Sequence, residues 1–589
     1  MHASTFVIAT LVACRGPGTP GDKPGPGGSG ETGISFDSTL PTADSAPTPP
    51  GTGDPAALSL PAPQPVDNGR FATADSCALC HDGAPGSNTM VDEVGNNIAP
   101  HDLWRSSMMA NAARDPLWRA VMSAEIAATP AAADAIGQKC TRCHAPLASG
   151  DATLTGASLP TADVLTDGDE ATFLALDGVS CTACHQIEDI GLGEEASASG
   201  GWTILGQGRI YGPHAEPFDH PMSMHGFTPL QSAHITDSGL CATCHTLTTH
   251  ALAEDGSETG GTVLEQGPYL EWLNSDHVAT SSCQGCHLPT VSAAGVPITT
   301  RIAHNPMGMA FPQTPPRSPF GRHLLVGANT LIPAILRDWP DVLRPGAPAS
   351  AFDATLAAAR DQLARQTATV QIGGVDLTAD TLSFDVDLRS MTGHKLPTGI
   401  PLRRLWLHAT VTDALGTIVF ESGASDDSGR LVDSDGVALP SEAVGGPVLP
   451  HLDAVSSGDE VAVYEAILAD GSGAPTFQLL RAAGFVKDNR LLPTGWDPTV
   501  AVVDGTAAVG VAGDPDFTGG SDTVHYTAEV ANHSGPLTIE IEALYQPLAA
   551  RWAAELFASG TPEALGFQAM YEAAERGPER VATDTAVVP

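Results

Sequence analysis

The chain has 589 residues, and 27 Lys plus Arg against 68 Asp plus Glu give it a formal net charge of −41. Such a charge excludes nucleic acid and anionic membrane surfaces as natural partners and favours redox partner proteins with basic docking surfaces; the alternative is that the acidity serves only solubility. The length predicts two or three domains, and a hydrophobic content of 42% excludes a wholly disordered protein.

The first 65 residues predict an export signal followed by a linker. Residues 5–13 form a short apolar run that ends at Cys14, and Leu11-Val12-Ala13-Cys14 resembles the lipobox of bacterial lipoproteins, in which the cysteine becomes lipidated. The signal departs from the usual pattern because residues 1–4 contain no Lys or Arg. Residues 1–14 are therefore assigned to a signal peptide with a lipobox, and the Gly/Pro-rich residues 15–65 to a disordered linker. We expect an exported bacterial lipoprotein, periplasmic or on the cell surface, that is anchored to the membrane through Cys14; export without lipidation is the alternative.

The pattern Cys-x-x-Cys-His occurs five times between residues 77 and 287. In this pattern two thiols bind the vinyl groups of one porphyrin, and the next residue binds the iron as its proximal ligand. The sequence therefore predicts five covalently bound haem c groups. The predicted thioether cysteines are Cys77, Cys80, Cys140, Cys143, Cys181, Cys184, Cys241, Cys244, Cys283 and Cys286, and the predicted proximal ligands are His81, His144, His185, His245 and His287.

A zinc ribbon and a redox dithiol are two other interpretations of a Cys-x-x-Cys pair. Neither requires a His directly after the second Cys, yet all five copies have one, and the pairs use ten of the eleven cysteines. The haem interpretation is therefore preferred. Five porphyrins in so short a stretch must lie close together, so residues 66–350 are predicted to form a pentahaem domain that folds only with its haems.

Each iron needs a sixth ligand unless it is catalytic, and histidines outside the motifs are the candidates. His101 begins a segment in which Trp104 and Met108 recur at helical spacing; Met108 is interpreted as a core residue. Four further histidines lie in a stretch interrupted by Pro and Gly between the third and fourth motifs, and His214 and His225 are favoured there over His220 and His234. The distal candidates are His101, His214, His225, His250, His323 and His394. Which candidate faces which iron is left open.

Residues 178–186, 240–247 and 283–289, around the last three motifs, resemble multihaem c-type cytochromes. The resemblance is to the superfamily that includes the nitrifier tetrahaem cytochrome and hydroxylamine oxidoreductase, and it covers residues 70–345. It implies stacked haem pairs, irons with two His ligands, and electron transfer, with catalysis in some members. No motif here replaces the proximal His by Lys, which weighs against a catalytic haem of the nitrite-reductase type.

The second half of the chain changes from helical to strand periodicity. Residues 351–368 predict a helix, and segments such as 382–388 and 537–544 alternate apolar and polar residues as half-buried strands do. We expect a helix and then a β-sandwich-like domain over residues 351–549, with a C-terminal helical segment and tail over residues 550–589. The predicted fold class is therefore multidomain: a mostly α and irregular multihaem cytochrome c domain plus a C-terminal β-sandwich-like domain with a terminal helix.

Two features of this half point to ligands. Lys395, Arg403 and Arg404 are rare cations in an acidic chain and are expected to pair with haem propionates, the alternative being ordinary salt bridges. The carboxylate-rich loops at residues 426–436 and 514–522 offer oxygen ligands for Ca²⁺, although neither has the spacing of an EF-hand, so calcium is the less favoured expectation there.

These patterns together predict an exported pentahaem cytochrome c that carries electrons between redox partners. An oxidoreductase that acts on a small nitrogen or sulfur species at one open iron is the alternative. A third interpretation makes the β-rich half a docking module and the haems a conduit to its partner.

Overall fold

The structure is a computed structural model that describes residues 53–589, which belong to one compact unit. The predicted signal peptide and lipidation site at Cys14 lie outside the described residues. The packed chain begins earlier than the predicted linker boundary, because Leu58 and Leu60 are buried. Among the described residues, no helix is both long and apolar enough to cross a membrane.

The part of the chain that carries the motifs is built from short helices joined by long loops, as predicted. Several of these helices begin with Pro, whose fixed φ suits the first turn. The helices are α1 (Ala74–His81), α2 (Pro100–Trp104), α3 (Pro116–Ala128), α4 (Ala133–His144), α5 (Pro146–Thr155), α6 (Glu170–Leu176), α7 (Cys181–Cys184), α8 (His220–Ser223), α9 (Ser238–His245), α10 (Pro268–Leu273), α11 (Cys283–His287), α12 (Leu331–Asp338), α13 (Pro340–Leu343) and α14 (Ala349–Gln366). Two small sheets accompany them: β1 (Arg209–Gly212) pairs in parallel with β2 (Thr228–Gln231), and β3 (Leu247–Leu252) pairs antiparallel with β4 (Glu258–Gln266).

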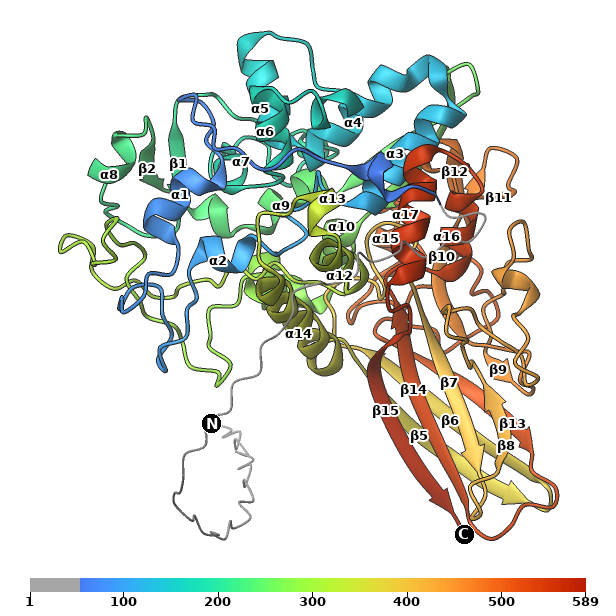
Figure 1. The fold of residues 1–589 in the computed structure, drawn as a ribbon. Helices are drawn as coiled ribbons and strands as arrows, with labels where there is room; N and C mark the ends of the chain where they lie inside the picture. The colour runs from blue at the N-terminus through green and yellow to red at the C-terminus, as the bar shows by residue number, and fades with distance from the viewer. Residues whose placement is uncertain (1–52) are drawn as a thin grey trace, which may run out of the picture. The chain divides into compact units, whose positions relative to one another are not determined.

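The second half contains two larger sheets (Figure 1). The four-stranded sheet has the order β5 (Ala368–Thr378), β6 (Thr381–Ser390), β13 (Ser521–Glu529) and β9 (Ala454–Val455). The seven-stranded sheet has the order β11 (Pro475–Thr476), β10 (Val463–Asp470), β7 (Arg404–Thr412), β14 (Leu537–Gln546) and β15 (Glu579–Val588), with β12 (Ala482–Asp488) paired to β10 and β8 (Ile418–Ser422) paired to β7. Helix α15 (Pro498–Asp504) precedes β13.

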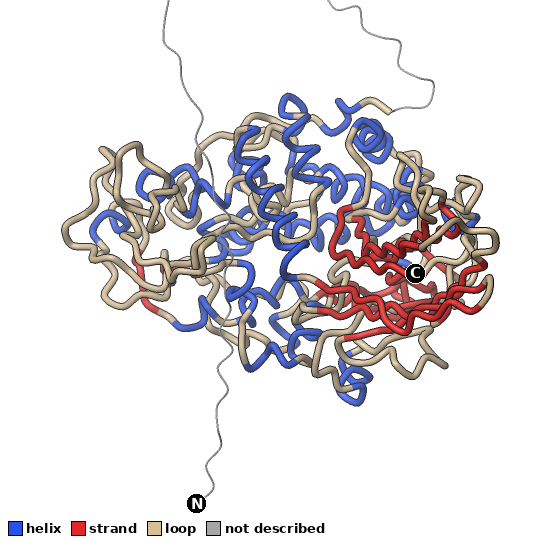
Figure 2. Tube along the Cα trace, turned by 90° about the horizontal axis from the view of Figure 1, so that it is seen from below, coloured by secondary structure: helices blue, strands red, loops and turns tan. Residues whose placement is uncertain are grey.

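Both large sheets contribute to one hydrophobic core. Buried residues alternate along β6 and β13, which places Phe384 and Tyr526 on the inner face with parallel stacked rings. Leu407 of β7 and Ile541 of β14 belong to the same cluster from the other sheet. Most of the strands gather together in Figure 2, whereas helices, loops and a few short strands make up the rest of the described chain. Helices in the first half and sheets in the second are thus confirmed.

The end of the chain differs from the expected helical segment and tail. Helices α16 (Ala550–Phe557) and α17 (Pro562–Ala573) are present, but residues 579–588 form strand β15 and pair with β14 over its full length. Helix α17 packs on α3 of the first half, where the hydroxyl of Ser123 donates to Glu563 at 2.6 Å. The chain therefore returns to the motif-bearing half before it ends in the sheet.

A second hydrophobic core joins the two halves. It includes Val121 of α3 and Phe352 of α14 as well as Trp552 of α16 and Phe567 of α17. At its edge the buried carboxylate of Glu125 accepts hydrogen bonds from the backbone N–H groups of Leu479 (2.6 Å) and Leu480 (3.3 Å). Burial raises the pKa of Glu125 to about 7.

The substitution Glu125→Gln is expected to weaken the pH dependence of stability between pH 4.5 and 7. Because the pKa of Glu125 is higher in the folded state than in the unfolded chain, the protonated side chain stabilises the fold at low pH. This contribution to the free energy of unfolding, about 3 kcal/mol, is fully present below pH 4.5 and is lost as the pH rises to about 7. Thermal unfolding of the holoprotein across this range measures the effect. Glu258→Gln, at an exposed carboxylate, is the control, and an unchanged profile for Glu125→Gln would contradict the assignment.

Candidate haem-attachment site

All five Cys-x-x-Cys-His motifs lie on short helices. The first, second, fourth and fifth motifs are the final residues of α1, α4, α9 and α11, and the third motif fills α7 with its His directly after it. Side chains three and four positions apart share one face of a helix. Each helix therefore presents two thiols and one imidazole on the same side, which is the arrangement that attachment of one porphyrin requires.

No disulfide bond links the ten cysteines of the five motifs in the structure. A zinc ribbon would bring Cys and His ligand atoms to one point. In residues 53–589, however, groups of three converging metal-ligand side chains occur only among His451, Asp514 and Asp522 and among Asp453, Asp516 and His525, far from the motifs in sequence. The geometry of the motifs therefore suits porphyrin attachment and does not suit zinc.

Four of the five proximal imidazoles are oriented by a backbone carbonyl. A hydrogen bond from Nδ1–H to a carbonyl fixes the tautomer and leaves Nε2 with its lone pair for a metal, as in many metal-bound histidines. The bonds are His81 to Ile302 (2.9 Å), His144 to Ala112 (3.0 Å), His185 to Tyr211 (2.6 Å) and His287 to Val326 (2.8 Å). The acceptors lie 26 to 221 residues away along the chain, so tertiary structure sets the orientation.

Burial favours the neutral form of three of these imidazoles, which is the form that binds a metal. Burial lowers the pKa of His81 and of His185, and it lowers the pKa of His144 to about 4. The ring of His144 also stacks on Trp118, with ring centroids 4.4 Å apart and planes 4° apart. These residues fit the role of proximal ligands to haem iron.

His245 differs from the other four. No hydrogen bond from its ring is present among the described residues, and its surface is exposed. Surrounding protein atoms nevertheless lower its pKa to about 4, and His287 and Arg403 add to the shift. The fourth motif is therefore the one whose imidazole the protein orients least.

Cysteines from different motifs lie close together. Helix α1 contacts α7, and α9 contacts α11. A hydrogen bond between Cys143 and Cys244 raises the pKa of the first thiol and lowers that of the second. In the same way Cys241 has a raised pKa and its partner Cys283 a lowered one of about 7. A hydrogen bond with Cys77 raises the pKa of Cys181. The pairs that meet are Cys77 with Cys181, Cys143 with Cys244 and Cys241 with Cys283, and Cys184 also lies near Cys244. The order of neighbouring motifs is thus first, third, fourth and fifth, with the second beside the fourth.

Among the distal candidates, His323 lies opposite a proximal imidazole. Its ring centroid is 6.4 Å from that of His185, and the two planes differ by 24°. Imidazole nitrogens on opposite sides of one metal ion are about 4 Å apart, which puts the ring centroids roughly 6 Å apart. His323 Nδ1 donates to the carbonyl of Gly321 at 3.1 Å, so Nε2 is free in both rings. Burial lowers the pKa of His323 to about 4.

His394 lies beside the fifth motif. Its Nδ1 donates to the carbonyl of Lys395 at 3.0 Å, which again leaves Nε2 free. Burial lowers its pKa, and His287 is one of the neighbouring charges that contribute. A histidine from the β-rich half therefore reaches the motif-bearing half.

His101 and His214 are half-buried, and both have a lowered pKa because of burial. His101 lies on α2 beside α1, and its buried Nδ1 has no hydrogen-bond partner. The charges that act on it include Asp75 and Asp82, which flank the first motif. His214 lies near Arg317. The structure thus places His101 at the first motif and leaves His214 without a motif partner.

The remaining two candidates lie at the surface. His225 is exposed and faces Asp67 at 3.4 Å, and His250 on β3 is exposed and faces Glu258 at 3.8 Å. By contrast His234, a less favoured histidine in the sequence, is buried with both nitrogens engaged, by Ser232 at 2.6 Å and the Ile187 carbonyl at 2.9 Å. His225 and His250 thus differ from His234 in solvent exposure, which the spacing of histidines in the sequence does not reveal.

Two of the three cations expected to pair with propionates bind protein carboxylates instead. Lys395 is fully buried and its Nζ lies 2.7 Å from Asp488. Arg404 forms a buried two-point pair with Glu442 at 2.6 and 3.1 Å. Arg403 is half-buried, donates to the Thr398 carbonyl at 2.6 Å, and lies close enough to His245 to affect its pKa. Among the described residues Arg403 has no carboxylate partner, so its pairing with a propionate stays a prediction.

Two carboxylates of the loop at residues 426–436 are engaged by their own loop, and no group of three converging metal-ligand side chains among the described residues includes this loop. Asp426 accepts hydrogen bonds from the backbone N–H groups of Ser428 and Arg430 and pairs with the Arg430 side chain, so its pKa falls to about 2. Asp433 accepts in the same way from Asp435 and Val437. These carboxylates close turns of their own loop, which explains their number without Ca²⁺.

No model of a protein family matches the chain, and no curated protein matches it. One solved structure that resembles it is a penta-heme cytochrome c552 from Thermochromatium tepidum. The sequences are 15% identical, the match covers 89% of this chain and 100% of that chain, and the TM-score is 0.47. The haem assignment rests on the motifs and their geometry, and not on this likeness.

Proposed function

We propose that this chain is an exported c-type cytochrome that binds five haems covalently and carries electrons between redox partner proteins. The observation that carries the proposal is the common geometry of the motifs: two thiols without a disulfide on one helix face beside an imidazole, with Nδ1 held by a backbone carbonyl in four of five cases. Bound there, haem supplies a one-electron change at its iron.

The protein's own residues set the conditions for that change. Neutral imidazoles with a free Nε2 stabilise the iron from one side, and the carbonyl acceptors of their Nδ1–H groups increase their basicity. A second His on the other face favours a lower reduction potential than Met would. The geometry supports His323 as the distal partner of His185, His394 as a ligand near the fifth motif, and His101 as a ligand at the first.

The order of neighbouring motifs supports a route for electrons through the molecule. The first and fifth motifs stand at its ends, and Cys286 of the fifth is exposed. Charge would enter or leave at these ends and pass through the third and fourth motifs, with the second as a branch beside the fourth. A net charge of −41 suits partners with basic docking surfaces. Lipidation at Cys14 would hold the protein at a bacterial membrane.

An oxidoreductase acting on a small nitrogen or sulfur species remains a second candidate. Among the six distal candidates, His101, His323 and His394 lie beside a motif with a nitrogen available, so these six can serve three of the five proposed irons. Binding of CO, cyanide or nitrite to the holoprotein tests this candidate. All-low-spin spectra without any such binding would remove it.

Five haems per chain are expected when the protein is matured in a host that attaches haem c. Intact mass combined with a pyridine haemochrome assay measures the number. Replacing both Cys283 and Cys286 by Ala should give four haems, whereas Cys14→Ser should keep five and lose only the lipid mass. A colourless protein, or one that retains zinc in place of haem, would contradict the proposal.

A further inference from the structure

Four aspartates converge at one edge of the four-stranded sheet, remote from the motifs in sequence. Asp522 lies on β13, Asp453 directly precedes β9, and Asp514 and Asp516 lie in the loop that leads into β13. Strands β9 and β13 pair in parallel, which brings these segments together. Ligand atoms of Asp514 and Asp522 lie within 4.8 Å of each other, as do those of Asp453 and Asp516, and a hydrogen bond links Asp514 with Asp516.

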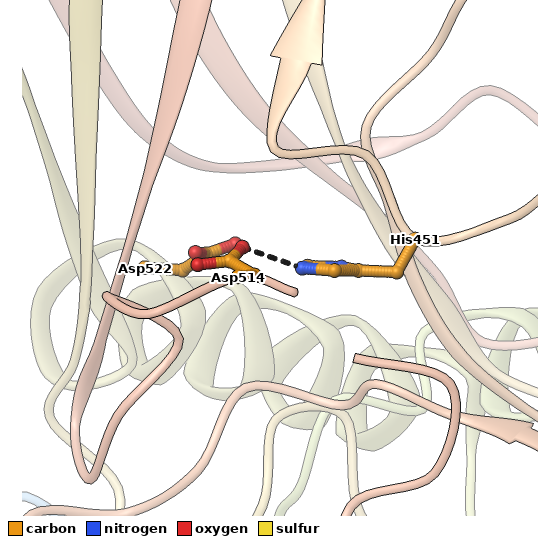
Figure 3. Close-up of side chains that lie close together, drawn as sticks. All are labelled: His451, Asp514 and Asp522. Atoms are coloured by element: carbon orange, nitrogen blue, oxygen red, sulfur yellow. Dashed lines mark hydrogen bonds and ion pairs between the residues drawn. The ribbon is translucent and has the colours of Figure 1, made fainter. Parts of the chain in front are cut away.

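Three carboxylate oxygens of this cluster are buried without a hydrogen-bond partner: Oδ1 of Asp453, of Asp516 and of Asp522. Asp522 is fully buried, and only its Oδ2 is engaged, by the hydroxyl of Tyr464 at 2.6 Å. Figure 3 shows the carboxylates of Asp514 and Asp522 side by side, facing His451. These oxygens belong to two carboxylate pairs, Asp514 with Asp522 and Asp453 with Asp516, which the hydrogen bond between Asp514 and Asp516 joins. Buried polar atoms are rarely left unpaired, so the unpartnered oxygens point to a bound ligand.

The protein provides little positive charge here. Within residues 53–589, no lysine or arginine forms an ion pair with any of the four aspartates; their only ion pairs join Asp514 to His451 at 2.7 Å and Asp453 to His525 at 3.9 Å. Burial and neighbouring aspartates raise the pKa of Asp522 to about 7 and that of Asp516 to about 6. Crowded carboxylates without cationic side chains are the environment in which a metal cation binds.

The imidazole of His451 is not available as a metal ligand. Asn489 is fixed in orientation because its Oδ1 accepts from the N–H of Glu465 at 3.1 Å and its Nδ2 donates to the carbonyl of Val463 at 2.8 Å. The same Nδ2 donates to Nδ1 of His451 at 3.0 Å, so the imidazole proton lies on Nε2 and is donated to Asp514 at 2.7 Å. The donor set that remains consists of carboxylate oxygens only.

We propose that the two adjoining carboxylate pairs, Asp514 with Asp522 and Asp453 with Asp516, draw together around one hard divalent cation of the calcium class. Oxygen-only ligands with several negative charges and flexible geometry suit Ca²⁺, whereas Zn²⁺ favours nitrogen and sulfur and Mg²⁺ requires strict octahedral geometry. The bound cation would tie the loop before β13 to the segment before β9 and so stabilise this edge of the sheet.

The test uses the full haem-loaded protein after dialysis against EDTA. Equilibrium dialysis with CaCl₂ followed by elemental analysis should give one Ca²⁺ per chain above the control level, and saturating Ca²⁺ should raise the Tm by about 2–5 °C. Asp522→Asn and Asp516→Asn should each weaken Ca²⁺ binding by about 10-fold or more. Asp433→Asn is the matched control, because Asp433 accepts only backbone hydrogen bonds of its own turn and Asn can accept them too.

Three results would overturn the proposal. The first is a Tm unchanged by Ca²⁺, and the second is the same Ca²⁺ response in Asp522→Asn as in the unmutated protein. The third is Zn²⁺ bound in preference to Ca²⁺, which would mean that an imidazole takes part. If Asp522→Asn does not fold, Asp516→Asn at the less buried side of the cluster decides between these outcomes. Haem content, measured on the same samples, reports on the cytochrome assignment separately.

Discussion

One equivalent of high-spin iron is expected when His323 is replaced by alanine in the haem-loaded protein. His323 and His185 hold their rings 6.4 Å apart with planes 24° from parallel, and each has its Nδ1 on a backbone carbonyl. Two such imidazoles fit opposite sides of one iron. Without His323 that iron would have one protein ligand, which changes its spin state and opens a coordination position.

Electron paramagnetic resonance and CO titration of His323→Ala measure this change. About one CO per chain should bind, the midpoint potential of one haem should rise, and the number of haems should stay the same because His323 takes no part in covalent attachment. His225→Ala is the control, since His225 is exposed and faces Asp67, and its spectra should match those of the unmutated protein. Unchanged low-spin spectra for His323→Ala would show that His185 has another partner.

A loss of roughly 3–5 kcal/mol of stability is expected when Asp488 is replaced by asparagine, because a charge buried in an ion pair is costly once its partner is removed. Asp488 is buried between two cations, Lys395 at 2.7 Å and Arg490 at 2.7 Å. These neighbours hold the pKa of Asp488 well below its usual range although burial opposes them. Arg490 also pairs with Glu271 of α10 at 3.3 Å, so the network joins the β-rich half to the motif-bearing half.

Thermal unfolding of Asp488→Asn should show a Tm lower by roughly 3–5 °C, because the large unfolding entropy of a folded unit of this size reduces the shift per kcal/mol. The control is Asp387→Asn, which removes the partner of Arg389 on the exposed face of β6 and should cost less than about 1 kcal/mol. Lys395 also positions the carbonyl that orients His394, so the spectrum of one haem should change together with the stability. Equal Tm values for the two variants would show that the buried network does not stabilise the junction.

The covalent part of the site could be predicted from the sequence because it depends only on local spacing. Side chains three and four positions apart share one face of a helix, so Cys77, Cys80 and His81 point to an attachment site wherever the helix lies. The alternation along residues 382–388 likewise predicted a half-buried strand, because the side-chain period of a strand is a local property. The signal peptide and Cys14 stay predictions.

The partners of these local units could not be predicted, because they come from distant parts of the chain. The carbonyl that orients His81 belongs to Ile302, and His185 faces His323. Spacing could not separate His323 from His250 at the surface, and the resemblance of Lys395 to a propionate-binding cation was misleading because Asp488 lies beside it. The pairing of residues 579–588 with β14 was equally hidden in the sequence.

The sequence by itself determined the five Cys-x-x-Cys-His motifs on which the proposed haem attachment rests, because thioether attachment needs only the order of neighbouring side chains. The tertiary structure decided which histidine faces which motif, which cations are already neutralised, and where four aspartates meet. Those features depend on distances between segments that are far apart in the chain, and packing alone sets such distances.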